Sequence, residues 1–196
     1  MAKATTAASK ALLGGTWKRK KWYEILAPKE FSEQPIGETI AAEPDTLIGR
    51  TMSINLMILT KDIRKQNINV TFRIVSVSGL KAYTEFIDYS MIPSSIKRLV
   101  RKGKEKIDFS FPATTKDGRI VRIKPIIICR SMTSRSITTD IKEAATKMSE
   151  DILKQIDYGQ FVKDIITQKF QRALKIQVSK IYPVKTADIR VSRLIK

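Results

Sequence analysis

The residues of this chain best suited to chemistry are basic side chains set beside aromatic rings. Trp17 and Trp22 bracket the run Lys18, Arg19, Lys20 and Lys21. Indole rings can stack on nucleobases while the charged groups meet phosphates. Residues 1–20 could instead be a solvated tail, and the run from Trp22 to Leu26 also reads as a core strand. We favour a basic arm over residues 1–20 that orders on RNA and includes Lys10.

A second cationic cluster lies on a short helix predicted at residues 94–103. Ser94 or Ser95 can cap this helix, and Gly103 can end it. Its apolar face would hold Ile96, Leu99 and Val100, and its opposite face Lys97, Arg98, Arg101 and Lys102. Ordinary solvated faces mix charge signs, because like charges on neighbouring turns repel. The pattern therefore favours RNA contact over a merely solvated face.

The charge of the whole chain is grouped in blocks. Lys plus Arg number 37 and Asp plus Glu 19, which gives a net charge of +18. Residues 1–21 carry six basic and no acidic groups, whereas residues 136–164 carry four basic and six acidic groups. Such blocks indicate a few surfaces that face a polyanion. Further candidate RNA contacts in or near them are Arg50, Lys104, Lys106, Lys116, Arg119, Arg122, Lys185, Arg190 and Arg193.

Residue types needed for catalysis are scarce. The chain has no histidine, which excludes an imidazole base or ligand, and its eight glycines form no phosphate-binding loop. Cys129 follows three isoleucines, so we expect a buried thiol rather than a nucleophile. The sequence therefore predicts a protein that is not an enzyme, without cofactor, metal site or small-molecule substrate.

The elements that must position the basic blocks are mainly strands, followed by helices. Alternating apolar residues predict strands around 52–58, 68–74, 81–89 and 107–111, and Asp117-Gly118 predicts a hairpin turn. Apolar stripes predict helices from Asp140 to Ile156 and from Phe161 to Leu174. We expect an α+β fold in which the strands form an antiparallel barrel or sandwich, with the short basic helix and two longer C-terminal helices packed on it.

The domain organisation follows from the same pattern. A length of 196 residues with 42% hydrophobic content suits one domain with appendages. We expect a basic arm at 1–20, a β-rich core at 21–135, and a helical hairpin with a basic C-terminal segment at 136–196 in the same domain. No apolar run approaches the roughly 20 residues of a membrane span. A single cysteine fits a cytoplasmic protein.

Several strings resemble one ribosomal family. They are the run from Lys20 to Pro28, then Phe31, Gly37-Glu38-Thr39, Leu47-Ile48-Gly49-Arg50, the run from Thr114 to Gly118, and Ile181-Tyr182-Pro183 with Lys185. Together these are similar to the archaeal and eukaryotic small-subunit ribosomal S-one-e family, also called S-three-a-e. The resemblance covers residues 17–196, and the short C-terminus resembles archaeal members.

The resemblance implies an antiparallel, β-barrel-like core with helices packed on it. It also implies a structural constituent of the small ribosomal subunit, cytoplasmic and in ribosomes. It implies a place on the platform near the messenger exit region, with ribosomal RNA, neighbouring small-subunit proteins and possibly messenger RNA as partners. The first alternative is a free RNA-binding module, such as a translation factor or RNA chaperone. A peripheral membrane protein is the second, but the helix from 140 to 156 is nearly charge-balanced, which disfavours membrane binding.

Overall fold

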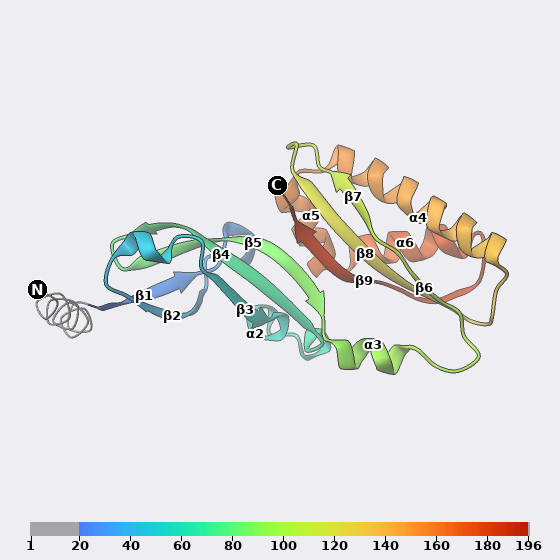
Figure 1. Cartoon of the computed structure of the whole chain (residues 1–196), viewed down its shortest axis with the longest axis horizontal. Helices are drawn as coiled ribbons and strands as arrows, with labels where there is room; N and C mark the ends of the chain where they lie inside the picture. The colour runs from blue at the N-terminus through green and yellow to red at the C-terminus, as the bar shows by residue number, and fades with distance from the viewer. Residues whose placement is uncertain (1–19, 196) are drawn as a thin grey trace, which may run out of the picture. The chain divides into compact units, whose positions relative to one another are not determined.

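The structure is a computed structural model that describes residues 20–195. Their strands are β1 (Lys21–Leu26), β2 (Pro35–Ala41), β3 (Thr51–Asn55), β4 (Ile68–Ser78), β5 (Lys81–Met91), β6 (Lys106–Asp108), β7 (Phe111–Thr114), β8 (Ile120–Cys129) and β9 (Val184–Leu194). Their helices are α2 (Leu56–Thr60), α3 (Pro93–Leu99), α4 (Arg135–Gln155), α5 (Tyr158–Ile166) and α6 (Lys169–Ser179), with short 3-10 helices η2 (Lys29–Phe31), η3 (Pro44–Leu47) and η4 (Ile63–Lys65) (Figure 1).

The described strands hydrogen bond in one sheet, in the order β2-β1-β5-β9-β8-β6, with β3 beside β4, β4 beside β5 and β7 beside β8. The expected α+β class is confirmed. The pairs β1–β2, β5–β9, β6–β8, β7–β8 and β8–β9 are antiparallel, whereas β1 and β5 pair in parallel over a short stretch. Within residues 20–195 this sheet does not close into a barrel, so the barrel-like description holds only loosely.

The chain divides into two compact units. Of the described residues, the first unit holds residues 20–53 and Phe72–Phe86, and the second holds Ile54–Thr71 and 87–195. The first unit has an apolar cluster of Tyr23, Ile25, Ala41, Leu47, Ile74 and Ala82. Beside it, the ring of Phe31 packs edge-on against Phe72, with 5.3 Å between ring centroids, and stacks on Phe86.

The second unit packs helices on one face of its sheet. Ile127 and Cys129 of β8 and Val184 and Ala187 of β9 pack against Ile141 and Ala145 of α4 and Leu174 and Val178 of α6. Figure 1 shows α4, α5 and α6 grouped beside the strands β7, β8 and β9. Because side chains alternate along a strand, Arg122 and Lys124, which alternate with the buried Val121 and Ile123 of β8, point to the other face. That face is where they can meet a partner.

The hairpin predicted at Asp117-Gly118 is confirmed. It joins β7 to β8, and Gly118 adopts the left-handed backbone, φ +75°, that glycine allows without strain. The N–H of Thr115 donates to the carbonyl of Arg119 at 2.9 Å, which closes the turn. The carboxylate of Asp117 also accepts a hydrogen bond from the backbone N–H of Tyr158, so the turn holds the start of α5.

The strand predicted through residue 58 is wrong in its second half. Leu56 begins α2, because the side chain of Asn55 accepts a hydrogen bond from the N–H of Met57 at 2.9 Å. A side chain that satisfies a free N–H in this way starts a helix. Leu56 and Leu59 are therefore buried on one helical face, while Ile58 is exposed.

The C-terminal helices also differ from the prediction. The first, α4, begins at Arg135, five residues before the expected cap at Asp140. Where one helix was expected from Phe161 to Leu174, the structure has α5 and α6, broken at Gln168, whose φ of +59° is incompatible with a continuous helix. The basic C-terminal segment forms the strand β9.

Candidate nucleic-acid interface

A cationic groove lies on the face of β8 and β9 opposite α4 and α6. Arg122 pairs with Arg193 and Lys124 with Val191 in the antiparallel register. Ile123 and Ser192, the residues between them, are buried. The groove has a volume of about 330 Å³ and is lined by Arg122, Lys124, Val191, Arg193 and Ile195. Its lining thus combines cationic and aliphatic side chains.

This lining suits a sugar–phosphate backbone. Basic side chains can bond phosphate oxygens, and aliphatic side chains can contact ribose or base. Two arginines directly opposite each other on neighbouring strands repel. Part of that repulsion is offset by Asp88 of β5, whose carboxylate accepts hydrogen bonds from Nε and Nη2 of Arg193, at 3.4 Å each. Arg122 and Lys124 then offer their charges to a ligand.

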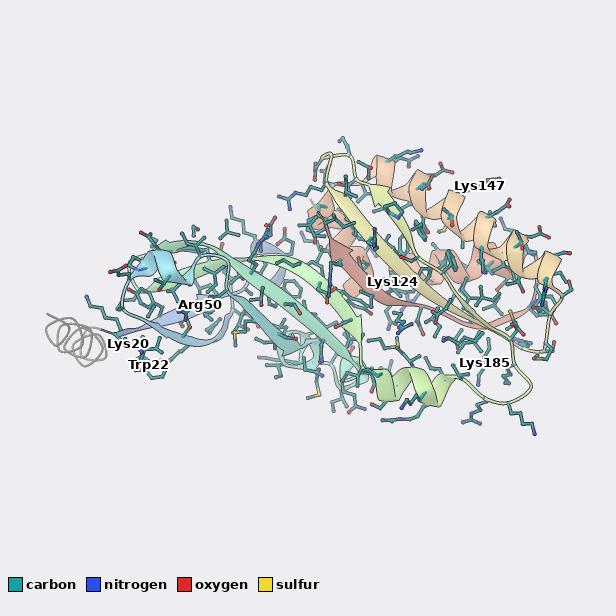
Figure 2. The ribbon with its side chains drawn as sticks, in the orientation of Figure 1. Lys20, Trp22, Arg50, Lys124, Lys147 and Lys185 are labelled. Carbon is teal, nitrogen blue, oxygen red and sulfur yellow. The ribbon has the colours of Figure 1, made fainter. Side chains whose placement is uncertain are left out.

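Lys124 is a residue that sequence reasoning missed. It precedes the apolar run from Pro125 to Cys129, so it reads as the polar edge of a buried strand. Figure 2 shows Lys124 over the paired strands β8 and β9. Its place in the groove depends on pairing with Val191, which is distant in the sequence. The exposed, alternating set Arg122 and Lys124 within one strand was the signal that could have found it.

The short basic helix is smaller than predicted. It runs from Pro93 to Leu99, and neither Ser94 nor Ser95 caps it. Proline needs no N–H partner at the first helical position, so Pro93 starts the helix. Val100 is already extended, so Arg101 and Lys102 lie in the loop that follows and not on the helix.

The faces of this helix are also less distinct than predicted. Ile96 and Leu99 are only half-buried, and Val100 is exposed, so the expected docking face is weak. Lys97 and Arg98 on the helix are exposed, as are Arg101 and Lys102 beyond it. This segment therefore presents four cations from a helix and a loop. Of the remaining loop candidates, Lys104 is half-buried.

Several predicted contacts have partners within the protein. The guanidinium of Arg50 donates to the carbonyls of Thr46 and Ile40 and to Oγ1 of Thr39, which fixes the chain between β2 and β3 (Figure 2). Arg119 lies over the ring of Tyr158, 5.1 Å from its centroid. Three ion pairs join Lys106 to Asp108 at 2.6 Å, Arg190 to Asp108 at 3.3 Å, and Lys116 to Asp157 at 3.8 Å.

At the start of the described chain, Lys20, Lys21 and Trp22 are exposed. Trp22 has 62% of its surface accessible, whereas Tyr23 and Ile25 of the same strand are buried. The strand reading of this run is right, but the core reading of Trp22 is wrong, because strand alternation turns its ring outward. Lys10, Trp17, Lys18 and Arg19 lie outside the described residues, so the arm stays a prediction.

The thiol of Cys129 is fully buried, as expected. Burial raises its pKa, and the nearby carboxylate of Glu105 raises it further. Both effects keep the thiol protonated, which is the opposite of what a nucleophile needs. The side chain of Cys129 thus packs in the apolar cluster between β8 and the helices.

On the helix side of the second unit lies a groove whose charged residues are mainly acidic. This groove of about 520 Å³ runs along α4 and is lined by Asp140, Glu143, Ala144, Lys147, Met148, Asp151, Ile152 and, from α6, Gln177. Figure 2 shows Lys147 on α4. Acidic groups outnumber basic ones in this lining, whereas those of the β8–β9 groove are basic. The two grooves of the second unit therefore differ in the sign of their charge.

Comparison with known proteins decides the family. A model of the ribosomal S3Ae family matches residues 9–196. The chain belongs to this family. The resemblance expected from the sequence is thereby confirmed, and the family is one of ribosomal proteins.

Curated members of the S3Ae family match along most of the chain. A small ribosomal subunit protein eS1 from Nanoarchaeum equitans is 36% identical over 85% of this chain and 84% of its own length. The protein of the same name from Methanothermobacter thermautotrophicus is 32% identical over 92% of this chain and 93% of its own length. The protein of the same name from Sulfurisphaera tokodaii is 30% identical over 96% of this chain and 97% of its own length.

Within residues 20–195, each helix is too short or too polar to cross a membrane.

Proposed function

We propose that this chain is a structural constituent of the small ribosomal subunit and binds ribosomal RNA through the β8–β9 groove and the basic segment around α3. The printed names of its S3Ae relatives support the small subunit. The resemblance adds a place on the platform near the messenger exit region, in cytoplasmic ribosomes. There the neighbours would be ribosomal RNA, other small-subunit proteins and messenger RNA.

One observation carries the RNA-binding part of the proposal. On one side of the second unit, Arg122, Lys124 and Arg193 line a groove together with two aliphatic residues. On α4, the corresponding groove holds Asp140, Glu143 and Asp151. A net charge placed only for solubility would not separate in this way. A surface that binds phosphates needs cations on one face. Without a polyanion, the repulsion between such cations destabilises the folded protein.

The test is a pair of matched double variants. Arg122→Gln with Lys124→Gln removes two charges from the groove, and Lys147→Gln with Lys154→Gln removes two from α4. Binding to small-subunit ribosomal RNA is measured over a range of salt concentrations. We expect weaker binding and a salt slope smaller by about 1.4 to 1.8 for the groove variant only, because each lost phosphate contact contributes roughly 0.7 to 0.9. Equal effects of the two variants would refute the proposal for this groove.

A free RNA-binding module remains the alternative function. Such a module would present exposed aromatic side chains on its sheet for stacking on single strands. The phenylalanines of β4 and β5, Phe72 and Phe86, are buried against Phe31, whereas Trp22 of β1 and Tyr83 of β5 are exposed, so aromatic exposure alone does not separate the two functions. Co-sedimentation separates the two functions: a constituent stays with small subunits through a high-salt wash, whereas a free module dissociates.

A further inference from the structure

Strand β9 has irregular pairing at two basic residues. Opposite β8, Ile128 pairs with Thr186 and Cys129 with Val184, which leaves Lys185 without a counterpart in the register. In the same way, Lys124 pairs with Val191 and Pro125 with Ile189, which leaves out Arg190. An extra residue of this kind forms a β-bulge, which bends the strand and redirects a side chain. Each bulge of β9 therefore places one basic residue, Lys185 or Arg190, outside the regular pairing with β8.

The two basic residues have opposite surroundings. Arg190 is paired with the carboxylate of Asp108 at 3.3 Å. Lys185, in contrast, is exposed and lies beside Lys104 and Arg101, with its amine within hydrogen-bonding reach of Lys104. The charges of Lys104 and Arg101 lower the pKa of Lys185. The bulge thus directs Lys185 toward like charges.

The backbone holds this arrangement in place. The N–H of Cys129 donates to the carbonyl of Glu105 at 3.0 Å, next to Lys104, and Cys129 pairs with Val184, next to Lys185. The end of β8 therefore ties together two segments about 80 residues apart in the sequence. Figure 2 shows Lys185 at the start of β9, near the loop that follows α3. The fold therefore places the chain segments that carry Lys104 and Lys185 on either side of the end of β8.

We propose that Lys104, Lys185 and Arg101 form a clamp for one phosphate group of an RNA backbone. The inference rests on the proposed function and adds a contact point that is separate from the β8–β9 groove. Lys185 and Arg193 stand eight residues apart on β9, which corresponds to roughly 25 Å at about 3.3 Å per residue. One phosphate cannot meet both places. A phosphate between the two amines replaces their repulsion with charge-assisted hydrogen bonds.

The clamp is tested on the full chain with Lys104→Met, Lys185→Met and the control Lys154→Met, an exposed lysine of α4. The probes are an oligouridylate of about ten nucleotides, within the site size of single-strand binders, and inorganic phosphate. Lysine amines carrying 13C-methyl groups are followed by NMR. We expect Lys104→Met to raise the pKa of Lys185, and the oligouridylate to shift the Lys104 and Lys185 signals together. Each clamp variant should bind the oligouridylate about tenfold more weakly, and the control as the unaltered chain.

The outcomes separate the clamp from the proposed function. If the clamp variants bind like Lys154→Met while the Arg122 and Lys124 double variant binds weakly, the clamp is refuted and the groove stands. If the groove variant also binds normally, both are refuted. A shift of the two lysine signals by inorganic phosphate but not by the oligouridylate would identify a free-anion site and would also overturn the RNA clamp.

Discussion

The carboxylate of Asp117, in the β7–β8 turn, accepts a hydrogen bond of 2.9 Å from the backbone N–H of Tyr158, the first residue of α5. The residue before α5, Asp157, makes no side-chain cap of its own. The helix is therefore capped by a residue 41 positions earlier in the chain. The N–H of Lys116 adds a second link to the carbonyl of Ile156 at 3.2 Å.

Replacing Asp117 should therefore destabilise the second unit. We expect Asp117→Ala to lower the free energy of unfolding by about 1 kcal/mol, within the 0.5 to 2 typical of lost helix caps. Asp117→Asn keeps an acceptor oxygen and should cost less, mainly the attraction between the charge and the helix dipole. Urea unfolding of the two variants measures the difference. Equal losses would show that charge, and not the hydrogen bond, holds the start of α5.

Two leucines that look alike in the sequence should differ in stability. Leu174 of α6 is fully buried among residues of β8 and α4, whereas Leu99 of α3 is only half-buried. Leu174→Ala should cost about 2 to 5 kcal/mol of unfolding free energy. Leu99→Ala should cost about 1 kcal/mol, because fewer apolar contacts are lost. Urea unfolding of both variants tests the ranking, and a larger loss for Leu99 would contradict the position of α3.

A half-buried carboxyl on β9 should make stability depend on pH. Burial raises the pKa of Asp188, and the nearby Lys175 only partly opposes this; Tyr89 also lies close. A raised carboxyl pKa favours the protonated form in the folded state. Its contribution to stability is therefore complete below the unfolded value of about 3.9 and is lost as pH rises through the folded pKa.

Asp188→Asn removes that titration. We expect the variant to be more stable than the unaltered chain at pH 7, with the advantage shrinking as the pH falls toward 4. Thermal unfolding at several pH values provides the measurement. An advantage that stays constant between pH 4 and pH 7 would mean that Asp188 is not the titrating group.

The exposed ring of Trp22 on β1, just after the basic arm of residues 1–20, offers a probe of RNA binding at this end of the chain. If RNA binds there, stacking of the indole ring on bases should quench tryptophan fluorescence. The sequence has two tryptophans, so Trp17→Phe isolates the signal of Trp22. We expect quenching on addition of small-subunit ribosomal RNA, reversed by high salt. Unchanged emission at saturating RNA would remove Trp22 from the interface.

Local patterns predicted the elements better than their ends. The turn at Asp117-Gly118 and the buried thiol of Cys129 follow from neighbouring residues alone, and both are confirmed. The change from strand to helix at Leu56 turns on one side-chain hydrogen bond of Asn55, which an alternating apolar pattern conceals. The start of α3 at Pro93 was visible in the sequence but was outweighed by the two serines that follow.

The candidate interface was harder to predict, because it depends on pairing between distant strands. Arg122 and Arg193 were expected singly as RNA contacts, but only the β8–β9 register brings them opposite each other, with Lys124 two positions along β8 from Arg122. The bulge at Lys185 has no local signature, since an extra residue is defined by the partner strand. Charge blocks therefore predict a polyanion as the ligand, whereas the geometry of the candidate interface depends on long-range register.

The β8–β9 groove is lined by cations and the α4 groove mainly by carboxylates, so charge is spread unevenly over the second unit. Near a polyanion, an uneven charge distribution experiences a torque before any contact forms. The side that holds the β8–β9 groove would turn toward the RNA, so a larger fraction of diffusional encounters would begin in a productive orientation.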